Sequence, residues 1–262
     1  MPAGSARYWS WLFAAPPMRA PLLGMYALLA EWHALMDPAT ETGVAHLKLA
    51  WWGEEMQRLQ HRSGVHPISV YLASLPNADA VDFNSLTVAV ASAAAQVGGA
   101  PLERGADLEP QSRALRGDPL ALASHLAFPA ITAADLRGCT TSLAAAEYLA
   151  NALGNFRREA RLGRVSFAID ELLAAGIENS DLAADVTPPH LQRYLDQVRE
   201  RARRCFEVAA AALTHAQRAE CRHLLVSAAL GLAHLSRSTP TAERRRLRDM
   251  LLAWSTARRA NR

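Results

Sequence analysis

Residues 149–165 read LANALGNFRREARLGRV, and three oxygen-bearing side chains in this stretch recur at every fourth position: Asn151, Asn155 and Glu159. Side chains at i and i+4 lie on the same face of an α-helix, one turn apart. Such a ladder of oxygens can hold Mg²⁺, which bridges protein oxygens to substrate phosphates. Basic side chains that could face phosphates lie beside it, namely Arg157, Arg158, Arg161 and Arg164. The stretch predicts a helix over 139–161 that presents a metal or anion site, a solvated polar face or a helix–helix seam.

The composition favours helices along the rest of the chain. Half of the 262 residues are hydrophobic, and alanine and leucine, which lose little conformational freedom in a helix, are the most frequent of them. Apolar residues recur with helical spacing in 18–36, 41–62, from Asp79 or Asp82 to about 98, 119–136, 188–213, 215–237 and 241–260. Residues 101–118, with two prolines and two glycines, are the most loop-like segment. We therefore predict one all-α domain over residues 1–262.

Charge and cysteine content exclude several classes of protein. The net charge is only +3, and no long basic stripe is interleaved with aromatic residues, so we expect no nucleic-acid partner. No apolar run reaches the roughly 20 residues needed to span a bilayer. Cys139, Cys205 and Cys221 show no C-x-x-C spacing, which argues against a zinc site and a disulfide scaffold. We expect a reducing, cytoplasmic location.

A second candidate site lies in residues 31–37, which read EWHALMD. His33 and Asp37 are four residues apart and would share a face of the helix expected over 18–36. The alternative is structural, with His33 as a half-buried core histidine and Asp37 ending the helix before Pro38.

These blocks resemble the squalene/phytoene synthase family. The family opens with a proline–arginine turn and then a tyrosine-containing helix with an aspartate motif, which Pro17, Arg19, Tyr26, Ala27 and Asp37 match. The segments WWGEEM (51–56), HP (66–67), LANALGNFRREARLGRV (149–165) and DELLAAGI (170–177) are similar to later family segments in order and spacing. The resemblance spans residues 6–235 or so.

The resemblance implies a single-domain helical bundle of the isoprenoid synthase type with a central cavity. It also implies two aspartate motifs on facing helices, which hold Mg²⁺ against the diphosphates of two prenyl donors that the enzyme joins head to head. Acidic ligands are needed there because they place the cations that stabilise the leaving diphosphate.

The chain departs from the family at both motifs. The first motif, Asp-Asp-x-x-Asp, is replaced by His33, Ala34 and Asp37, and the second, Asp-x-x-x-Asp, by Asn155 and Glu159. Histidine is a poor Mg²⁺ ligand and alanine is none. The ladder on 151–159 nevertheless resembles the Asn/Asp–Ser/Thr–Glu metal motif of terpene synthases. A degenerate metal site would comprise Asp37, Asn151, Asn155, Glu159 and His33.

Two functions follow from these departures. The first is a non-catalytic or diverged member that binds an isoprenoid, a lipid or a protein partner, similar to an assembly factor. In that case the four arginines at 157–164 bind the diphosphate or headgroup directly, or they form surface ion pairs. The second is an active Mg²⁺-dependent prenyl transferase of the squalene or phytoene synthase type. The loss of acids favours the first.

The C-terminal segment 238–262 is predicted to be a basic helix. Its basic character comes from arginines at positions 244–246, 248, 258, 259 and 262. A solvated helix face is one reading, and peripheral contact with anionic lipid headgroups, at the inner membrane, is the other.

Overall fold

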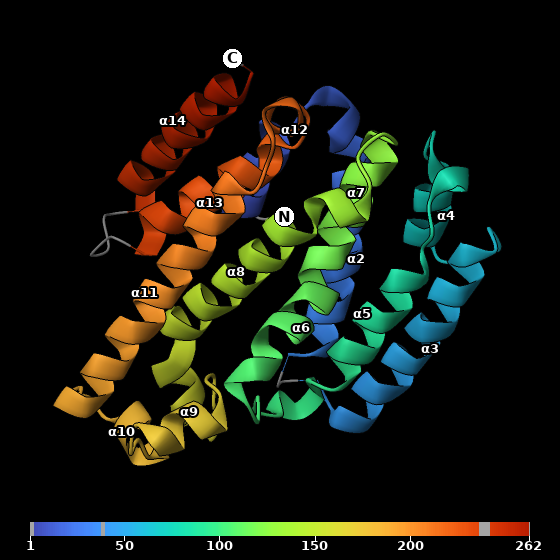
Figure 1. Cartoon of the computed structure of the whole chain (residues 1–262). Helices are drawn as coiled ribbons and strands as arrows, with labels where there is room; N and C mark the ends of the chain where they lie inside the picture. The colour runs from blue at the N-terminus through green and yellow to red at the C-terminus, as the bar shows by residue number, and fades with distance from the viewer. Residues whose placement is uncertain (1–2, 38–39, 236–241, 262) are drawn as a thin grey trace.

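The computed structural model describes residues 3–37, 40–235 and 242–261, and the side chains of 242–245 are not described. All regular elements in these ranges are helical, so the expected all-α single domain is confirmed (Figure 1). The longer elements are α1 (Ala6–Leu12), α2 (Arg19–Leu35), α3 (Thr42–Gln60), α4 (Pro67–Ala73), α5 (Asn84–Ala94), α6 (Leu108–Ser112), η5 (Arg113–Gly117), α7 (Asp118–Ala127), α8 (Ala133–Arg161), α9 (Ile169–Ala174), α10 (Asn179–Ala183), α11 (Pro189–Ala211), α12 (His215–Glu220), α13 (Arg222–Leu235) and α14 (Ala242–Ala260).

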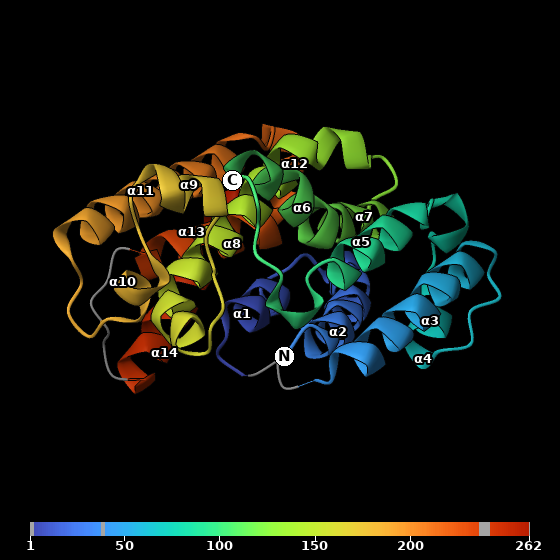
Figure 2. The same ribbon diagram turned by 90° about the horizontal axis from the view of Figure 1, so that it is seen from below.

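Helix α2 lies in the core of one half of the molecule, beside α3, α4, α5 and α7 (Figure 2). Its residues Leu22, Met25, Leu29 and Trp32 follow helical spacing and are fully or almost fully buried. This is the stripe that the sequence predicts over 18–36. Each such side chain stabilises the fold by about 1.5–3 kcal/mol through removal of apolar area from water. The stripe fixes which face of α2 turns toward solvent, and that face contains His33.

Helices α8 and α11 run side by side in the other half (Figure 1). Leu149 and Ala152 of α8 pack with Leu191, Leu195 and other apolar residues of α11 in one buried cluster. The remaining face of α8, which contains the ladder at 151, 155 and 159, is turned away from this core.

The predicted boundary between the helices at 119–136 and 139–161 is wrong. Helix α7 ends at Ala127, and α8 begins at Ala133. Pro129 lies in the connection rather than inside a helix. The Thr132 side chain accepts a hydrogen bond from the backbone of Asp135, whose carboxylate accepts one from the backbone of Thr132, so a reciprocal cap starts α8.

Residues 101–118 are more regular than expected. They contain α6 and then η5, a wide helical turn with i→i+5 geometry. Gly117 allows η5 to lie directly against α8, because a Cβ at this position would come within 3.0 Å of the Thr140 carbonyl oxygen. The helix expected over 215–237 is divided at Cys221 into α12 and α13. Helix α14 packs on α13, while residues 238–241 and 262 of the predicted basic segment lie outside the described residues.

Candidate functional site

The ladder on α8 forms as the spacing predicts, but its members bond to one another and to arginines. The Asn155 side-chain amide donates to the Asn151 carbonyl at 3.1 Å and to Asn151 Oδ1 at 2.8 Å. One Glu159 oxygen accepts from Arg158 at 2.8 Å, and the other accepts from Arg164 at 2.7 Å. Partial burial alone would raise the pKa of Glu159, but the two arginines outweigh it and lower the pKa.

The four arginines near the end of α8 each have a partner within the protein. Arg158 and Arg164 bind Glu159. Arg157 donates to Thr187 Oγ1 at 2.8 Å, and Arg161 donates to Asp185 Oδ1 at 2.6 Å. The last two therefore connect α8 to the 183–187 segment. Their expected role in diphosphate binding remains a prediction.

His33 and Asp37 lie at and just beyond the C-terminal end of α2. The His33 side chain is accessible to solvent, and its Nδ1 is 2.6 Å from the Leu29 carbonyl oxygen. Protein atoms crowd it nevertheless: desolvation first, and then the charges of Arg7 and Arg116, lower its pKa to about 4. Asp37 is exposed after the last turn of α2.

A cluster of charged residues meets His33 from three other elements. It consists of Arg7 on α1, Arg116 on η5 and Glu147 on α8, with Tyr26 of α2 among them. Arg116 and Glu147 form an ion pair in which both side chains are about one-fifth exposed. We call Arg7, Tyr26, His33, Arg116 and Glu147 the central cluster. The central cluster connects α2, the helix of the first motif, with α8, the helix of the second.

Arg7 is the least satisfied member of the central cluster. Its guanidinium makes no hydrogen bond or ion pair with any described residue. Desolvation, followed by repulsion from Arg116, lowers its pKa to about 10 despite the opposing charge of Glu147. A partly buried cation without a partner is stabilised by an anion, so this position favours an anionic ligand.

One member of the central cluster, Glu147, could have been found from the sequence. Glu147 is four residues before Asn151 and so extends the ladder by one step, to 147, 151, 155 and 159. Nothing in the local sequence marks Arg7 or Arg116, because the turn that positions Arg116 lies in a segment whose sequence pattern is typical of a loop.

The side chains present do not fit an Mg²⁺ site. Both Glu159 oxygens accept hydrogen bonds from arginine, and the Asn151 side-chain oxygen accepts one from the Asn155 amide nitrogen. Across 3–37, 40–235 and 242–261, no three His, Cys, Asp or Glu side chains come together in a way that could hold a metal. Arg7 and Arg116 instead bring positive charge to the region between the two motifs.

Comparison with known proteins agrees with this arrangement of helices. The family model "Squalene/phytoene synthase" matches residues 2–248, and the chain belongs to that family. A crystal structure of a dehydrosqualene synthase in complex with a ligand superposes with a TM-score of 0.78 at 14% identity, covering 97% of this chain and 92% of that one. Squalene synthase HpnC from Alicyclobacillus acidocaldarius gives a TM-score of 0.71 at 17% identity, covering 87% and 85%. A search of curated proteins gave no match. The fold is therefore the all-α isoprenoid synthase fold.

Proposed function

We propose that this chain is a diverged, non-catalytic member of the squalene/phytoene synthase family that binds a prenyl diphosphate without Mg²⁺. The observation that carries the proposal is the unpartnered, desolvated Arg7 between the two motif helices. In this proposal Arg7 and Arg116 take the charge of the diphosphate directly, where family enzymes use metal held by aspartates.

The acid positions support the same proposal. Of the family's five motif acids, Asp37 and Glu159 are the two that remain acidic, and Glu159 is neutralised by two arginines. Ionisation of an allylic diphosphate needs cations that are placed on the leaving group. The described donors do not fit such a metal, so we expect binding without turnover. A role for this ligand-binding fold in recognising a protein partner, as in an assembly factor, remains a prediction.

Calorimetric titration with farnesyl and geranylgeranyl diphosphate, in EDTA and in Mg²⁺, tests the proposal. We expect equal affinity in both, and binding at least about tenfold weaker in Arg7→Gln, as expected for a lost charge-assisted contact. Arg104→Gln is the matched control, because Arg104 is exposed and pairs with Asp107. Binding that requires Mg²⁺, or release of diphosphate during the titration, would instead favour the active prenyl transferase.

A second feature favours peripheral contact with a membrane. Helix α14 buries Asp249, Ala253, Ala257 and Ala260 on one face. Its opposite face exposes three large apolar side chains, Leu247 at 63%, Leu251 at 58% and Trp254 at 47%. No described helix has the length and apolar character needed to cross a bilayer.

The charges around this apolar face favour an anionic bilayer as the occupant. Among the side chains of α14 that the structure describes, the exposed arginines are Arg246, Arg248, Arg258 and Arg259, and the Arg258 guanidinium lies 5.4 Å from the centroid of the Trp254 ring. Apolar residues flanked by arginine are typical of helices that lie in a lipid interface. The location that we propose is cytoplasmic, with peripheral contact at the inner membrane.

Co-sedimentation with vesicles tests this contact. We expect binding to vesicles of equimolar phosphatidylglycerol and phosphatidylcholine and little binding to phosphatidylcholine alone. Leu251→Glu should abolish it. Leu47→Glu should not, since Leu47 is a 74% exposed leucine on α3. Equal loss in both variants, or equal binding to both vesicles, would overturn the membrane proposal.

A further inference from the structure

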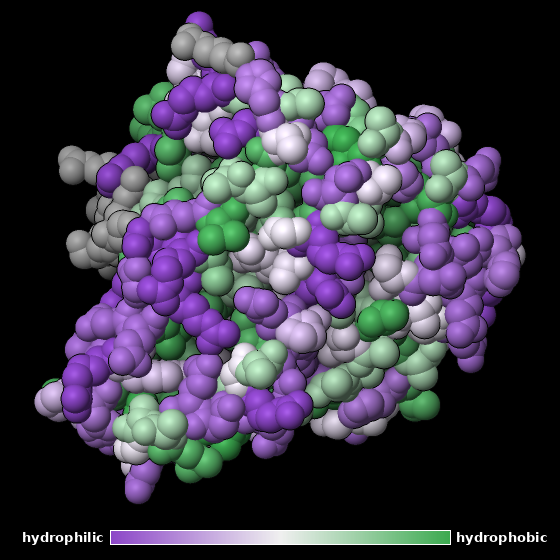
Figure 3. Space-filling model, viewed as in Figure 1, coloured by the Kyte–Doolittle hydropathy of each residue, from purple (hydrophilic) through white to green (hydrophobic). Residues whose placement is uncertain are grey.

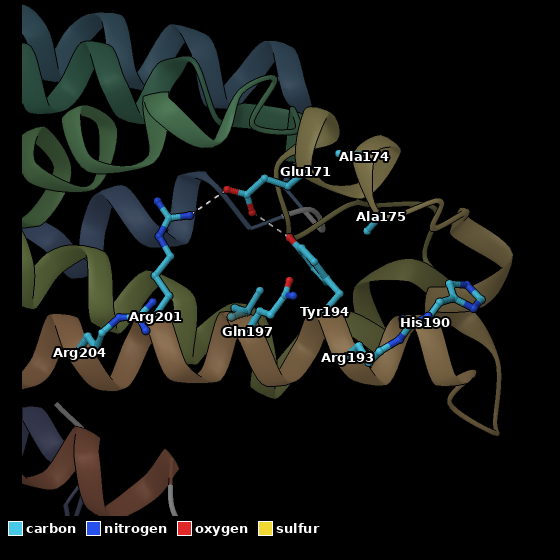
Figure 4. Close-up of a pocket in the computed structure, with 10 residues that line it drawn as sticks. Glu171, Ala174, Ala175, His190, Arg193, Tyr194, Gln197, Arg201 and Arg204 are labelled. Carbon is cyan, nitrogen blue, oxygen red and sulfur yellow. Dashed lines mark hydrogen bonds and ion pairs between the residues drawn. The ribbon is translucent and has the colours of Figure 1, made fainter.

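An open pocket of about 640 Å³ lies between α9 and α11 (Figure 4). One wall is α9, with Glu171, Ala174 and Ala175. The other is a polar stripe of α11 at positions 190, 193, 197, 201 and 204, whose spacing places these side chains on one helix face over about 21 Å. The opposite face of α11 packs on α8, so the pocket belongs to neither motif and shares no residue with the central cluster.

The pocket is basic. Its lining contains Arg193, Arg201 and Arg204 but a single carboxylate, Glu171. Both Glu171 oxygens are already bound: Arg201 donates to one at 2.8 Å and Tyr194 donates its hydroxyl hydrogen to the other at 3.0 Å (Figure 4). In Figure 3, which has the same view as Figure 1, hydrophilic residues cover the surface along α11. The single acid is thus satisfied, and the pocket keeps a net positive charge.

Two of the three arginines keep most of their hydrogen-bonding capacity. Arg204 makes one bond, at 3.4 Å, to Glu200, and Arg193 makes one, at 3.4 Å, to the Pro189 carbonyl, among the described residues. Arg201 uses one nitrogen on Glu171, which fixes the guanidinium in the pocket. Arg201 and Arg204 are three residues apart, so their guanidinium groups can approach the same anion. His190 at the far end is paired with Asp181 at 3.0 Å.

Apart from the charged residues, His190 and Gln197, the lining is largely apolar. Ala174, Ala175 and Val198, with the ring of Tyr194, border the space beside the arginines. A pocket of this volume and mixed lining suits a small organic molecule with one strongly anionic end. Arginine forks bind the oxygens of phosphate and of carboxylate, and the net positive charge of the pocket favours phosphate, which is the more highly charged of the two.

We propose that the α9–α11 pocket binds the phosphate or diphosphate group of a small molecule, with Arg201 and Arg204 as its ligands. This site is separate from the prenyl diphosphate site proposed above. The bond to Glu171 holds the Arg201 guanidinium in the lining of this open pocket. The source of the anion, a free diphosphate or a phosphorylated metabolite, is distinguished by titrating each.

Calorimetry with inorganic diphosphate, in EDTA, tests the pocket. Arg204→Gln should weaken binding about fivefold or more, because a charge-assisted contact is lost. Arg203→Gln is the matched control: it removes the same charge one residue away, from a side chain that pairs with Glu200 and Glu207 outside the pocket. It should change the affinity by less than about twofold. Equal effects of the two variants would show diffuse electrostatics and overturn the proposal.

A second measurement separates this pocket from the central cluster. Arg7→Gln should leave diphosphate binding at the pocket unchanged. In amide-resolved NMR titrations, the signals of Ala174 and Ala175 should shift in the wild type and in Arg7→Gln, and shift less in Arg204→Gln. Shifts confined to α1, α2 and η5, or no binding at millimolar diphosphate, would overturn the proposed pocket while leaving the prenyl diphosphate proposal to its own test.

Discussion

The Nε of Arg164 lies 2.7 Å from Oε2 of Glu159, across the turn that ends α8. Gly163 between them adopts a positive φ of 75°, a conformation that glycine accepts without strain, and the Arg164 backbone amide donates to the Glu159 carbonyl oxygen at 2.9 Å. The position that is acidic in the family's second motif is therefore held by the residue that closes its own helix. A carboxylate in this arrangement stabilises the helix end rather than a metal.

This arrangement predicts a pH-dependent effect of Glu159→Gln. Because the folded protein lowers the pKa of Glu159, the carboxylate stabilises the fold above its ordinary pKa of 4.5, and this contribution is lost as the pH falls through the lowered value. We expect the variant to be less stable by about 1 kcal/mol at neutral pH. Urea denaturation of both proteins at neutral pH and well below pH 4.5 checks it. A difference that stays constant with pH would contradict the prediction.

The burial of His223 predicts a second pH dependence, that of the stability of the whole fold. It is fully buried, and neither ring nitrogen has a hydrogen-bond partner among the described residues. Desolvation, with the charge of Arg222, lowers its pKa to about 3 from 6.5. The unfolded chain therefore binds a proton that the folded chain does not, and stability falls as the pH drops from 6.5 toward 3.

His223→Leu should make this loss of stability shallower. It should not abolish it, because His33 also has a lowered pKa. Thermal unfolding of both proteins across this range measures the slope. An identical slope would show that His223 is protonated in the fold.

Two glycines in helices predict opposite effects of alanine. A Cβ at Gly231 of α13 would overlap the ring of Phe206, which is almost fully buried, whereas a Cβ at Gly53 of α3 would meet nothing within 4 Å. Gly231→Ala should therefore destabilise the protein by about 1–3 kcal/mol through overpacking. Gly53→Ala should stabilise it by up to about 1 kcal/mol through helix propensity. The urea midpoints of the two variants and the wild type test both expectations. If both variants changed the stability in the same direction, the packing of α13 on α11 would be contradicted.

The cap of α8 predicts a third effect on stability. Thr132→Ala removes the side-chain oxygen that starts the helix and should cost about 1 kcal/mol. Thr132→Ser keeps the hydroxyl and should cost much less. If both variants were as stable as the wild type, the start of α8 would not depend on this cap.

The long helices were predictable because one face of each is buried. The pattern over 18–36 gave α2 to within a residue at each end, and that over 188–213 gave α11 to within two. Short elements such as α4, α9 and α10 contain fewer than two turns and show too little periodicity to be detected. The break at 128–132 was marked by Pro129 and by the Thr132–Asp135 cap, but helical sequence patterns on both sides obscured it.

The site was predictable only in part, for a physical reason. Residues on one helix, such as Asn151, Asn155 and Glu159, are related by spacing, and the structure places them on one face as expected. The partners of Glu147 and His33 come from α1 and η5, more than twenty residues away in sequence, and no local pattern reports such contacts. The family resemblance supplied the motif helices, whereas the charged contacts between them are seen only in the structure.

The wide turn η5 makes the Arg116–Glu147 pair depend on the length of the chain as well as on its residues. A turn with i→i+5 geometry holds about one residue more than an α-helical turn. Deleting a single residue between 113 and 117 would let α6 continue directly into α7, and each position after the deletion would rotate by about 100° around the helix axis. Arg116 would then leave Glu147, although both residues would still be present. The presence of one residue in this turn therefore decides whether η5 and α8 are joined by the Arg116–Glu147 ion pair.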